Sequence, residues 1–308
     1  MLTAPETEDV QRLEHALDVA NPEASGFQVL DSGEVSAVLR HDSVPDAVLK
    51  RIGGFPTHND ASRYARSVTD YVAGLRDREV PCLRTDCVVV QSHGGEWATY
   101  VVQPAVAVER LGKSWLSTAE GAEAADIVQQ IADFNHRAHQ QQGLTPNTMS
   151  YAIDSQVSNW VIDASTVVAL LDVTTPLSCR AGRKTAECEP ILRGFPRPLR
   201  GLVRRSGRVE RVFDVHFDNR SNLVDIAANL IKEGRPDLVA HVVHAANRWL
   251  VDHDQLAAIH PDEVSAYYRR NARALELSSK IRRFDVAVHR LTRRPYHAVL
   301  PAQVERNA

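Results

Sequence analysis

Two short apolar runs, residues 160–162 and 167–171, lie on either side of a polar turn at residues 163–166. This pattern predicts a β-hairpin. Asn159 immediately precedes the first strand and Asp172 immediately follows the second. Antiparallel pairing would bring these two residues to the same end of the hairpin. Asp154 lies on the loop before them, so the segment predicts three oxygen-bearing side chains in one place.

Such a set of side chains favours a site for a hard cation. Mg²⁺ prefers oxygen ligands and keeps its other positions for water and phosphate. We therefore expect Asn159 and Asp172 to bind Mg²⁺, with Asp154 close to the same ion. An Asp-x-x-x-x-Asn motif alone is common and usually marks a turn, so its meaning depends on the rest of the chain.

The first third of the chain has the periodicity of strands around one helix. Apolar residues predict strands at residues 27–30, 35–39, 47–52, 87–91 and 97–102, the third of them stopping at Gly53. Helical spacing is seen at residues 8–19 and 60–76, and the second of these helices lies between the third and fourth strands.

The rest of the chain is mainly helical. Ser117 and Glu120 have the spacing of a capping box, which predicts that a helix begins there. Further helices are predicted at residues 223–232, 238–251 and 264–289. The fold class is therefore α+β with two lobes. We expect a small β-rich lobe at residues 1–106 and a larger helical lobe at residues 107–308.

On these residues the chain resembles the protein-kinase-like superfamily, which includes aminoglycoside and other small-molecule phosphotransferases. Asp154-x-x-x-x-Asn159 resembles its catalytic loop, and Asp172 follows at the spacing of its metal-binding aspartate. Lys50, in Val-Leu-Lys, resembles the lysine that holds the α- and β-phosphates. The whole chain also resembles an uncharacterised family of actinobacterial kinase-like proteins.

Two further segments resemble nucleotide-binding elements of that superfamily. Gly33 lies between the first two strands, where a glycine loop covers the phosphates. The run from Tyr100 to Pro104, with Gln103, resembles the strand that leads into the adenine-binding hinge. The resemblance implies an ATP- and Mg²⁺-dependent phosphotransferase that acts on the hydroxyl of a small molecule. In it Asp154 is catalytic, and Gly33, Lys50 and Gln103 bind the cofactor.

Several departures from the superfamily pattern keep alternatives open. One glycine remains in the phosphate loop, and Ala152-Ile153 replaces the usual His-Arg or His-Gly. No Phe-Gly follows Asp172, and no Ala-Pro-Glu triplet is present, which argues against a regulated protein kinase. A catalytically inactive binding protein and an atypical protein kinase are the alternatives. Either Asp60 or Asp70 could be the helix acid that pairs with Lys50.

Charge is distributed unevenly along the chain. Residues 1–176 hold 12 Lys and Arg against 24 Asp and Glu, and residues 177–308 hold 24 against 15. Seven arginines fall within residues 193–211, where a solvated face is the default and an anion site the alternative. Nucleic-acid binding is not expected, because Phe195 is the only aromatic residue there.

Other signals point to a protein of the cytoplasm without a membrane partner. No apolar run is long enough to span a bilayer, and the first ten residues carry no base. The four cysteines form no Cys-x-x-Cys pair. Asp214-x-His216-x-Asp218 alternates, and we expect a turn or a surface pair there rather than a metal site. Oligomeric state is left open.

Overall fold

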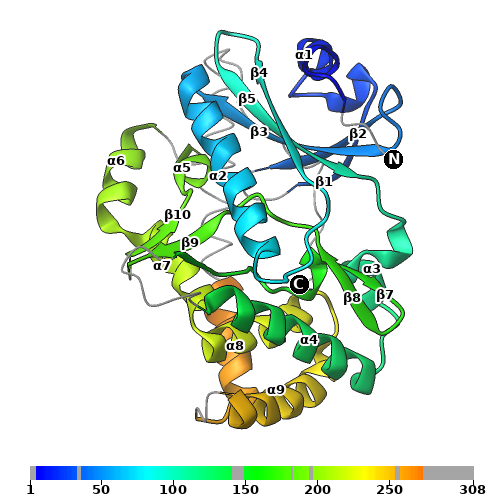
Figure 1. The fold of residues 1–308 in the computed structure, drawn as a ribbon, viewed down its shortest axis with the longest axis vertical. Coiled ribbons are helices and arrows are strands. Elements are labelled where there is room, and N and C mark those ends of the chain that lie inside the picture. The colour runs from blue at the N-terminus through cyan, green and yellow to red at the C-terminus, as the bar shows by residue number, and fades with distance from the viewer. Residues whose placement is uncertain are drawn as a thin grey trace.

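The computed structural model describes residues 5–32, 36–140, 149–181, 183–193, 197–253 and 257–272. It consists of a β-rich N-terminal lobe and a mainly helical C-terminal lobe (Figure 1). This confirms the α+β two-lobed fold expected from the sequence. The notebook-free boundary is simple: residues 106 and 107 fall between the last strand of the N-terminal sheet and the first turn that follows it, and the division of the chain there stays a prediction.

The N-terminal lobe is built on a five-stranded antiparallel sheet with the order β1-β2-β3-β5-β4. Helix α2 (His58–Arg76) connects the third strand to the fourth and runs down beside the sheet toward the C-terminal lobe (Figure 1). The strands are β1 (Phe27–Ser32), β2 (Ala37–His41), β3 (Ala47–Phe55), β4 (Asp86–Gln91) and β5 (Trp97–Pro104).

Strand β3 is longer than the sequence predicted. Instead of stopping at Gly53 it continues to Phe55, which pairs with Trp97 after a shift of register. The shift is possible because Gly54 has a φ of 81°, which a residue without a Cβ adopts at little cost. The prediction that the two glycines end the strand was therefore wrong.

The two faces of β3 serve different parts of the molecule, because side chains alternate along a strand. Leu49 belongs to an apolar cluster with Val10 and Leu13 of α1 (Thr7–Ala16), whereas Ile52 belongs to the core beneath α2. Lys50 and Arg51 are adjacent, so their side chains leave opposite faces of the sheet.

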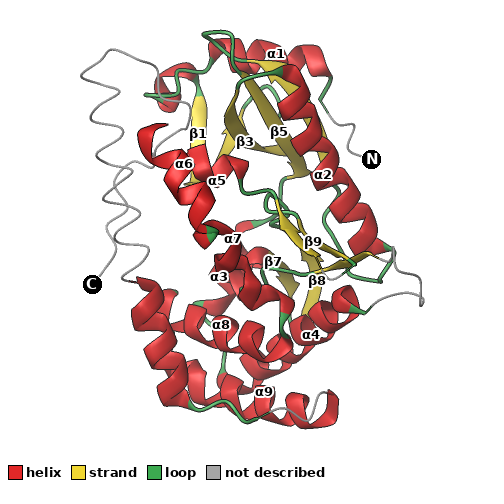
Figure 2. Ribbon diagram, turned by 90° about the vertical axis from the view of Figure 1, so that its left-hand side faces the viewer, coloured by secondary structure: helices red, strands yellow, loops and turns green. Residues whose placement is uncertain are grey.

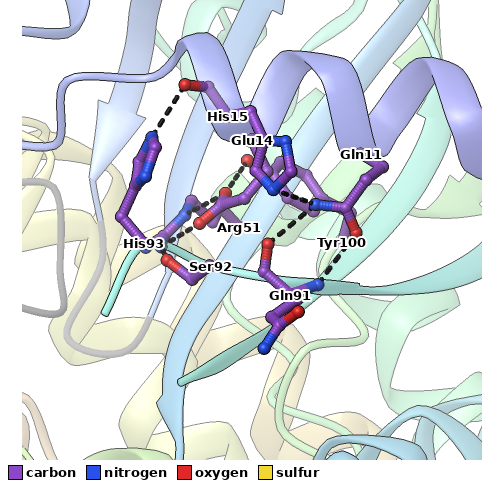
Figure 3. A network of polar contacts seen from close by, with 8 residues as sticks. All are labelled: Gln11, Glu14, His15, Arg51, Gln91, Ser92, His93 and Tyr100. Atoms are coloured by element: carbon purple, nitrogen blue, oxygen red, sulfur yellow. Dashed lines mark hydrogen bonds and ion pairs between the residues drawn. The ribbon is translucent and has the colours of Figure 1, made fainter. Parts of the chain in front are cut away.

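Arg51 fastens α1 to the outer face of the sheet (Figure 3). Its Nε and one terminal nitrogen donate to the two carboxylate oxygens of Glu14, at 2.8 and 2.7 Å. Tyr100 donates to the same carboxylate, and Ser92 accepts from Arg51 at 3.3 Å. Glu14 and Arg51 are 1% and 3% exposed, so this ion pair is buried.

The C-terminal lobe contains most of the helices (Figures 1 and 2). They are α3 (Gly112–Leu116), α4 (Gly121–His139), α5 (Glu189–Arg193), α6 (Arg197–Ser206), α7 (Arg208–Val212), α8 (Asn219–Lys232) and α9 (Val239–His253), and residues 261–272 are also helical. No helix within the described ranges is both long and apolar enough to cross a bilayer.

Short strands and 3₁₀ turns connect these helices. The strands are β6 (Met149–Tyr151), β7 (Trp160–Asp163), β8 (Thr166–Leu170), β9 (Leu177–Arg180) and β10 (Arg183–Ala186). They form a three-stranded sheet, β10-β9-β6, and the hairpin β7-β8. The 3₁₀ turns are η1 (Pro22–Ser25), η2 (Val108–Arg110), η3 (Val157–Asn159), η4 (Phe213–Phe217) and η5 (Pro236–Leu238).

Helix α4 begins four residues later than the predicted capping box would place it. Its N-cap residue is Glu120, whose backbone N–H donates to the Glu123 carboxylate at 3.1 Å. The Ser117 hydroxyl instead donates to the carbonyl of Ser114, in the helix before it. Ser117 is thus used locally to close α3, and the capping prediction at that residue was wrong.

One apolar core joins the two lobes. It includes Tyr71 of α2, Ile131 of α4, Trp160 of β7 and Leu170 of β8, each less than 5% exposed. Because α2 packs on both the N-terminal sheet and this core, its position is fixed relative to the β7-β8 hairpin.

Gly112 shows how closely α3 approaches the loop before that hairpin. A Cβ at this position would lie 1.9 Å from the backbone oxygen of Val157. We expect Gly112→Ala to destabilise the protein by about 1–3 kcal/mol, because backbone must move to admit the methyl group. Gly201→Ala in α6, where a Cβ meets no atom within 4 Å, is the control and should not lower the stability. Urea unfolding measures both, and equal stabilities would contradict the close approach.

Candidate functional site

The hairpin brings Asn159 and Asp172 together. Trp160 pairs with Leu170, and the backbone N–H groups of Leu171 and Asp172 both donate to the carbonyl of Asn159, at 2.8 and 3.3 Å. The two residues therefore stand at neighbouring strand ends, as the sequence pattern suggested. Their roles as metal ligands stay a prediction.

Asn159 also fixes the loop that carries Asp154. Its side-chain nitrogen donates to the Asp154 carbonyl at 3.0 Å. This bond uses the amide nitrogen, so the amide oxygen is the atom that Asn159 can offer to a cation. Asp154 is partly buried, and its Oδ1 has no hydrogen-bond partner among the described residues.

Lys50 reaches the hairpin from the N-terminal sheet. Its ammonium donates to the carbonyl of Leu171 at 2.8 Å and lies 3.6 Å from Oδ1 of Asp172. The residue is only 5% exposed, so the two lobes meet at a buried cation and the carboxylate beside it.

The ion pair of Lys50 is thus made with Asp172 and not with either helix acid considered from the sequence. Asp60 accepts from Thr57 and from Arg63 at the start of α2, and Asp70 is exposed. The apolar spacing of α2 explains this result, because positions facing the core carry aromatic side chains instead of acids.

Two tyrosines of α2 hold the site in place. Tyr64 donates to the carbonyl of Thr174 and Tyr71 donates to the carbonyl of Ala152, both at 2.6 Å. Burial raises the pKa of each phenol well above its ordinary value, so both remain hydrogen-bond donors. Helix α2 therefore contacts the chain on both sides of the hairpin.

The electrostatics of Asp172 keep it charged. Burial raises the pKa of its carboxyl, but the Lys50 ammonium and two hydrogen bonds from Thr174 outweigh this effect and lower the pKa below its ordinary value. The backbone N–H and hydroxyl of Thr174 donate to Oδ1, at 3.1 and 2.8 Å. Since Lys50 also approaches Oδ1, the second oxygen is the one directed to other partners.

Two buried asparagines clamp the residue before Asp154. Ile153 donates its backbone N–H to Asn135 of α4 at 3.1 Å, and its carbonyl accepts from Asn222 of α8 at 3.0 Å. Both asparagines are 2% exposed. The sequence prediction missed them, although an asparagine within each apolar helix face was a visible signal. They provide, together with Tyr71, the support that the loop requires beside Ala152 and Ile153.

The predicted nucleotide contacts are described in part. Gln103 of β5 is 2% exposed; its nitrogen donates to Thr85 at 3.2 Å, and its Oε1 has no partner among the described residues. Gly33 lies outside the described residues.

The arginine-rich segment is partly engaged within the protein. Arg193 is 9% exposed, lies 4.5 Å from the Phe55 ring and donates to the Gly54 carbonyl at 2.6 Å. Arg204 pairs with Glu189. A wholly solvated face does not describe these arginines, since Arg193 joins the C-terminal lobe to β3.

His216 and Asp225 are two buried residues beside Asp154 that the sequence prediction did not place there. His216 lies in η4 and Asp225 lies on α8, and they are 5% and 7% exposed. The expected turn is present, but His216 points inward, whereas Asp214 pairs with Lys184 at 3.0 Å. An alternating pattern was insufficient to show this, because a 3₁₀ turn changes which residues share a face.

The order of the strands, the helix between β3 and β4 and the hairpin site together define a two-lobed, kinase-like fold. A family model described as a "Family of unknown function (DUF6206)" matches residues 13–286. The chain therefore belongs to this family. No curated protein matches the chain.

Among solved structures, the chain is similar to the one described as "Structure of the streptomycin-ATP-APH(2")-IIa ternary complex". The sequence identity is 8% and the TM-score is 0.34, and the match covers 78% of this chain and 99% of the other. The assignment of the fold rests on the strand order and the element sequence given above.

Proposed function

We propose that this protein is an ATP- and Mg²⁺-dependent phosphotransferase that acts on the hydroxyl of a small molecule. The observation that carries the proposal is one connected set of contacts between the lobes. Lys50 approaches Asp172 at 3.6 Å, Asp172 donates its N–H to the Asn159 carbonyl at 3.3 Å, and Asn159 donates to the Asp154 carbonyl at 3.0 Å. A cation, a carboxylate, an amide and a second carboxylate are the side chains that phosphoryl transfer requires.

The residues present fit a bound magnesium ion and nucleotide. The second carboxylate oxygen of Asp172 and the amide oxygen of Asn159 would hold Mg²⁺, since their other polar atoms are already engaged. When bound, Mg²⁺ neutralises charge on the phosphates. The unpartnered Oε1 of Gln103 is a buried acceptor that an adenine amino group would satisfy.

The protein's own groups then have separate tasks. Lys50 contributes positive charge to the phosphate side of the site. Asp154 accepts the proton of the acceptor hydroxyl, and its unpartnered Oδ1 is free for that bond. Asn135, Asn222 and Tyr71 hold the loop so that the carboxylate does not have to be ordered during the reaction.

A catalytically inactive binding protein is the second candidate. The contacts of Lys50 with Leu171 and Asp172 favour it, because they engage the ammonium that phosphates would otherwise neutralise. The two candidates differ in turnover and not in nucleotide binding, so both are tested on the same protein.

Nucleotide binding is tested by thermal unfolding with ATP, with and without Mg²⁺. A ligand that binds only the folded state at 100 times its Kd stabilises it by about 2.7 kcal/mol. We expect Asp172→Ala to remove the Mg²⁺-dependent part of the shift. Asp163→Ala is the matched control, since Asp163 belongs to the same hairpin and its side chain is 63% exposed.

The outcomes separate the possibilities. A shift in the wild type and the control, but without its Mg²⁺-dependent part in Asp172→Ala, supports the proposed site. A folded wild-type protein that shows no shift with ATP or GTP contradicts it.

A further inference from the structure

Asp154, His216 and Asp225 form a cluster at the side of the catalytic loop away from the hairpin contacts described above. One ligand atom from each of the three side chains lies within 4.8 Å of the other two. They come from the loop after β6, from η4 and from α8, so the fold brings together residues up to 71 positions apart.

Two atoms of this cluster are buried without a hydrogen-bond partner among the described residues: Oδ1 of Asp154 and Nδ1 of His216. Buried polar atoms nearly always have partners, because leaving one unpaired costs the full desolvation free energy. His216 is 5% exposed, so solvent does not readily supply the missing bond. The cluster therefore lacks a binding partner.

The third member, Asp225, is held in a fixed orientation. One carboxylate oxygen accepts from the Tyr267 hydroxyl at 2.8 Å, and the other accepts from the Asn229 amide at 3.1 Å. Each oxygen keeps further acceptor capacity. Outer partners of this kind orient the carboxylate ligands of metal ions in proteins.

The charges of the cluster also call for a cation. Burial and the neighbouring Asp154 carboxylate raise the pKa of Asp225, which shows that the two acids repel each other. Lys232 is the lysine nearest to consider, but its ammonium donates to Gln156 at 3.2 Å and lies 3.8 Å from Glu233. A divalent ion between the acids would remove the repulsion and satisfy the imidazole nitrogen.

We propose that Asp154, His216 and Asp225 bind a divalent transition-metal ion, at a site separate from the one assigned to Mg²⁺. The imidazole decides the class of metal, because a nitrogen with two carboxylates suits Zn²⁺, Co²⁺ or Mn²⁺, whereas Mg²⁺ prefers oxygen ligands. Bonds of about 2.0–2.2 Å need the three ligand atoms to move closer. Asp154 can supply this movement, since its side chain is on a loop and partly buried.

The site has a consequence that rests on the proposed function. A metal bound to Asp154 takes the lone pair that would accept the proton of the acceptor hydroxyl. Transition-metal binding and phosphoryl transfer are therefore expected to compete for one carboxylate. Metal binding itself does not depend on this consequence and is measured without nucleotide.

The test is titration of the full chain with Co²⁺ in excess Mg²⁺, followed by calorimetry and by the visible absorption of the bound ion. We expect one Co²⁺ per chain in the wild type. His216→Ala should weaken binding by more than the roughly 10–100-fold that loss of an outer partner costs. His244→Ala is the matched control, because His244 is exposed on α9, and it should bind as the wild type does.

A second variant keeps the test decisive if His216→Ala does not fold. Tyr267→Phe removes one outer hydrogen bond of Asp225 and should weaken Co²⁺ binding by roughly 10–100-fold. Absence of Co²⁺ binding in the wild type, or equal binding by folded His216→Ala and His244→Ala, overturns the proposal; so does unchanged binding by Tyr267→Phe. Co²⁺ binding without any ATP-dependent thermal shift would reject the proposed function and leave the metal site standing.

Discussion

Asp154→Asn is expected to lower the rate of phosphoryl transfer by roughly 10²–10⁴, which corresponds to about 3–5 kcal/mol in the activation free energy. The substitution keeps the size of the side chain but removes the charge and the proton acceptor. Release of inorganic phosphate from Mg·ATP, with water in place of the acceptor hydroxyl, measures the effect. The backbone contact from Asn159 is to the Asp154 carbonyl, so the substitution leaves that hydrogen bond in place.

The affinity for ATP should change little, because Asp154 is assigned to the acceptor and not to the phosphates. Asp163→Asn, in the exposed turn of the hairpin, controls for removal of a negative charge nearby and should retain the wild-type rate. Full turnover by Asp154→Asn, or a parallel loss of rate and affinity, would contradict the assignment. A wild-type protein that binds Mg·ATP without releasing phosphate favours the inactive binding protein.

The elements that the sequence predicted best are those with a strong period and short connections. The hairpin around residues 163–166 is an example, because apolar strands flanking a tight turn can pair in few ways. Its geometry follows from local pattern, and so does the meeting of Asn159 with Asp172. The end of β3 was predicted less well, since a glycine can end a strand or permit an irregular register within it.

Contacts between distant elements could not be predicted in the same way. Which residue of α2 approaches the hairpin depends on how the helix is rotated over the sheet, and the sequence offered Asp60 and Asp70 without an argument for the tyrosines. His216 and Asp225 meet Asp154 only after η4 and α8 have packed against the loop. Local propensity has no information on such long-range placement.

Arg51→Met is expected to destabilise the protein by about 3–5 kcal/mol, because it leaves the Glu14 carboxylate buried without its cation. Burial raises the pKa of Glu14, but its bonds and charge interaction with Arg51 outweigh this and lower the pKa below the ordinary value. The stabilisation is therefore complete above the pKa of the unfolded state and is lost as the pH falls through the lower pKa of the folded state. Urea unfolding at neutral and acid pH measures both effects.

Arg12→Met on the same helix is the control, since Arg12 is 77% exposed in its pair with Asp9 and should contribute about 1 kcal/mol or less. The double variant Glu14→Leu/Arg51→Met removes both buried charges and should be more stable than Arg51→Met alone. Because Arg51 follows Lys50 on β3, loss of the pair should also loosen α1 from the strand that carries the lysine. If Arg51→Met costs no more than Arg12→Met, then the buried pair does not hold α1 on the sheet.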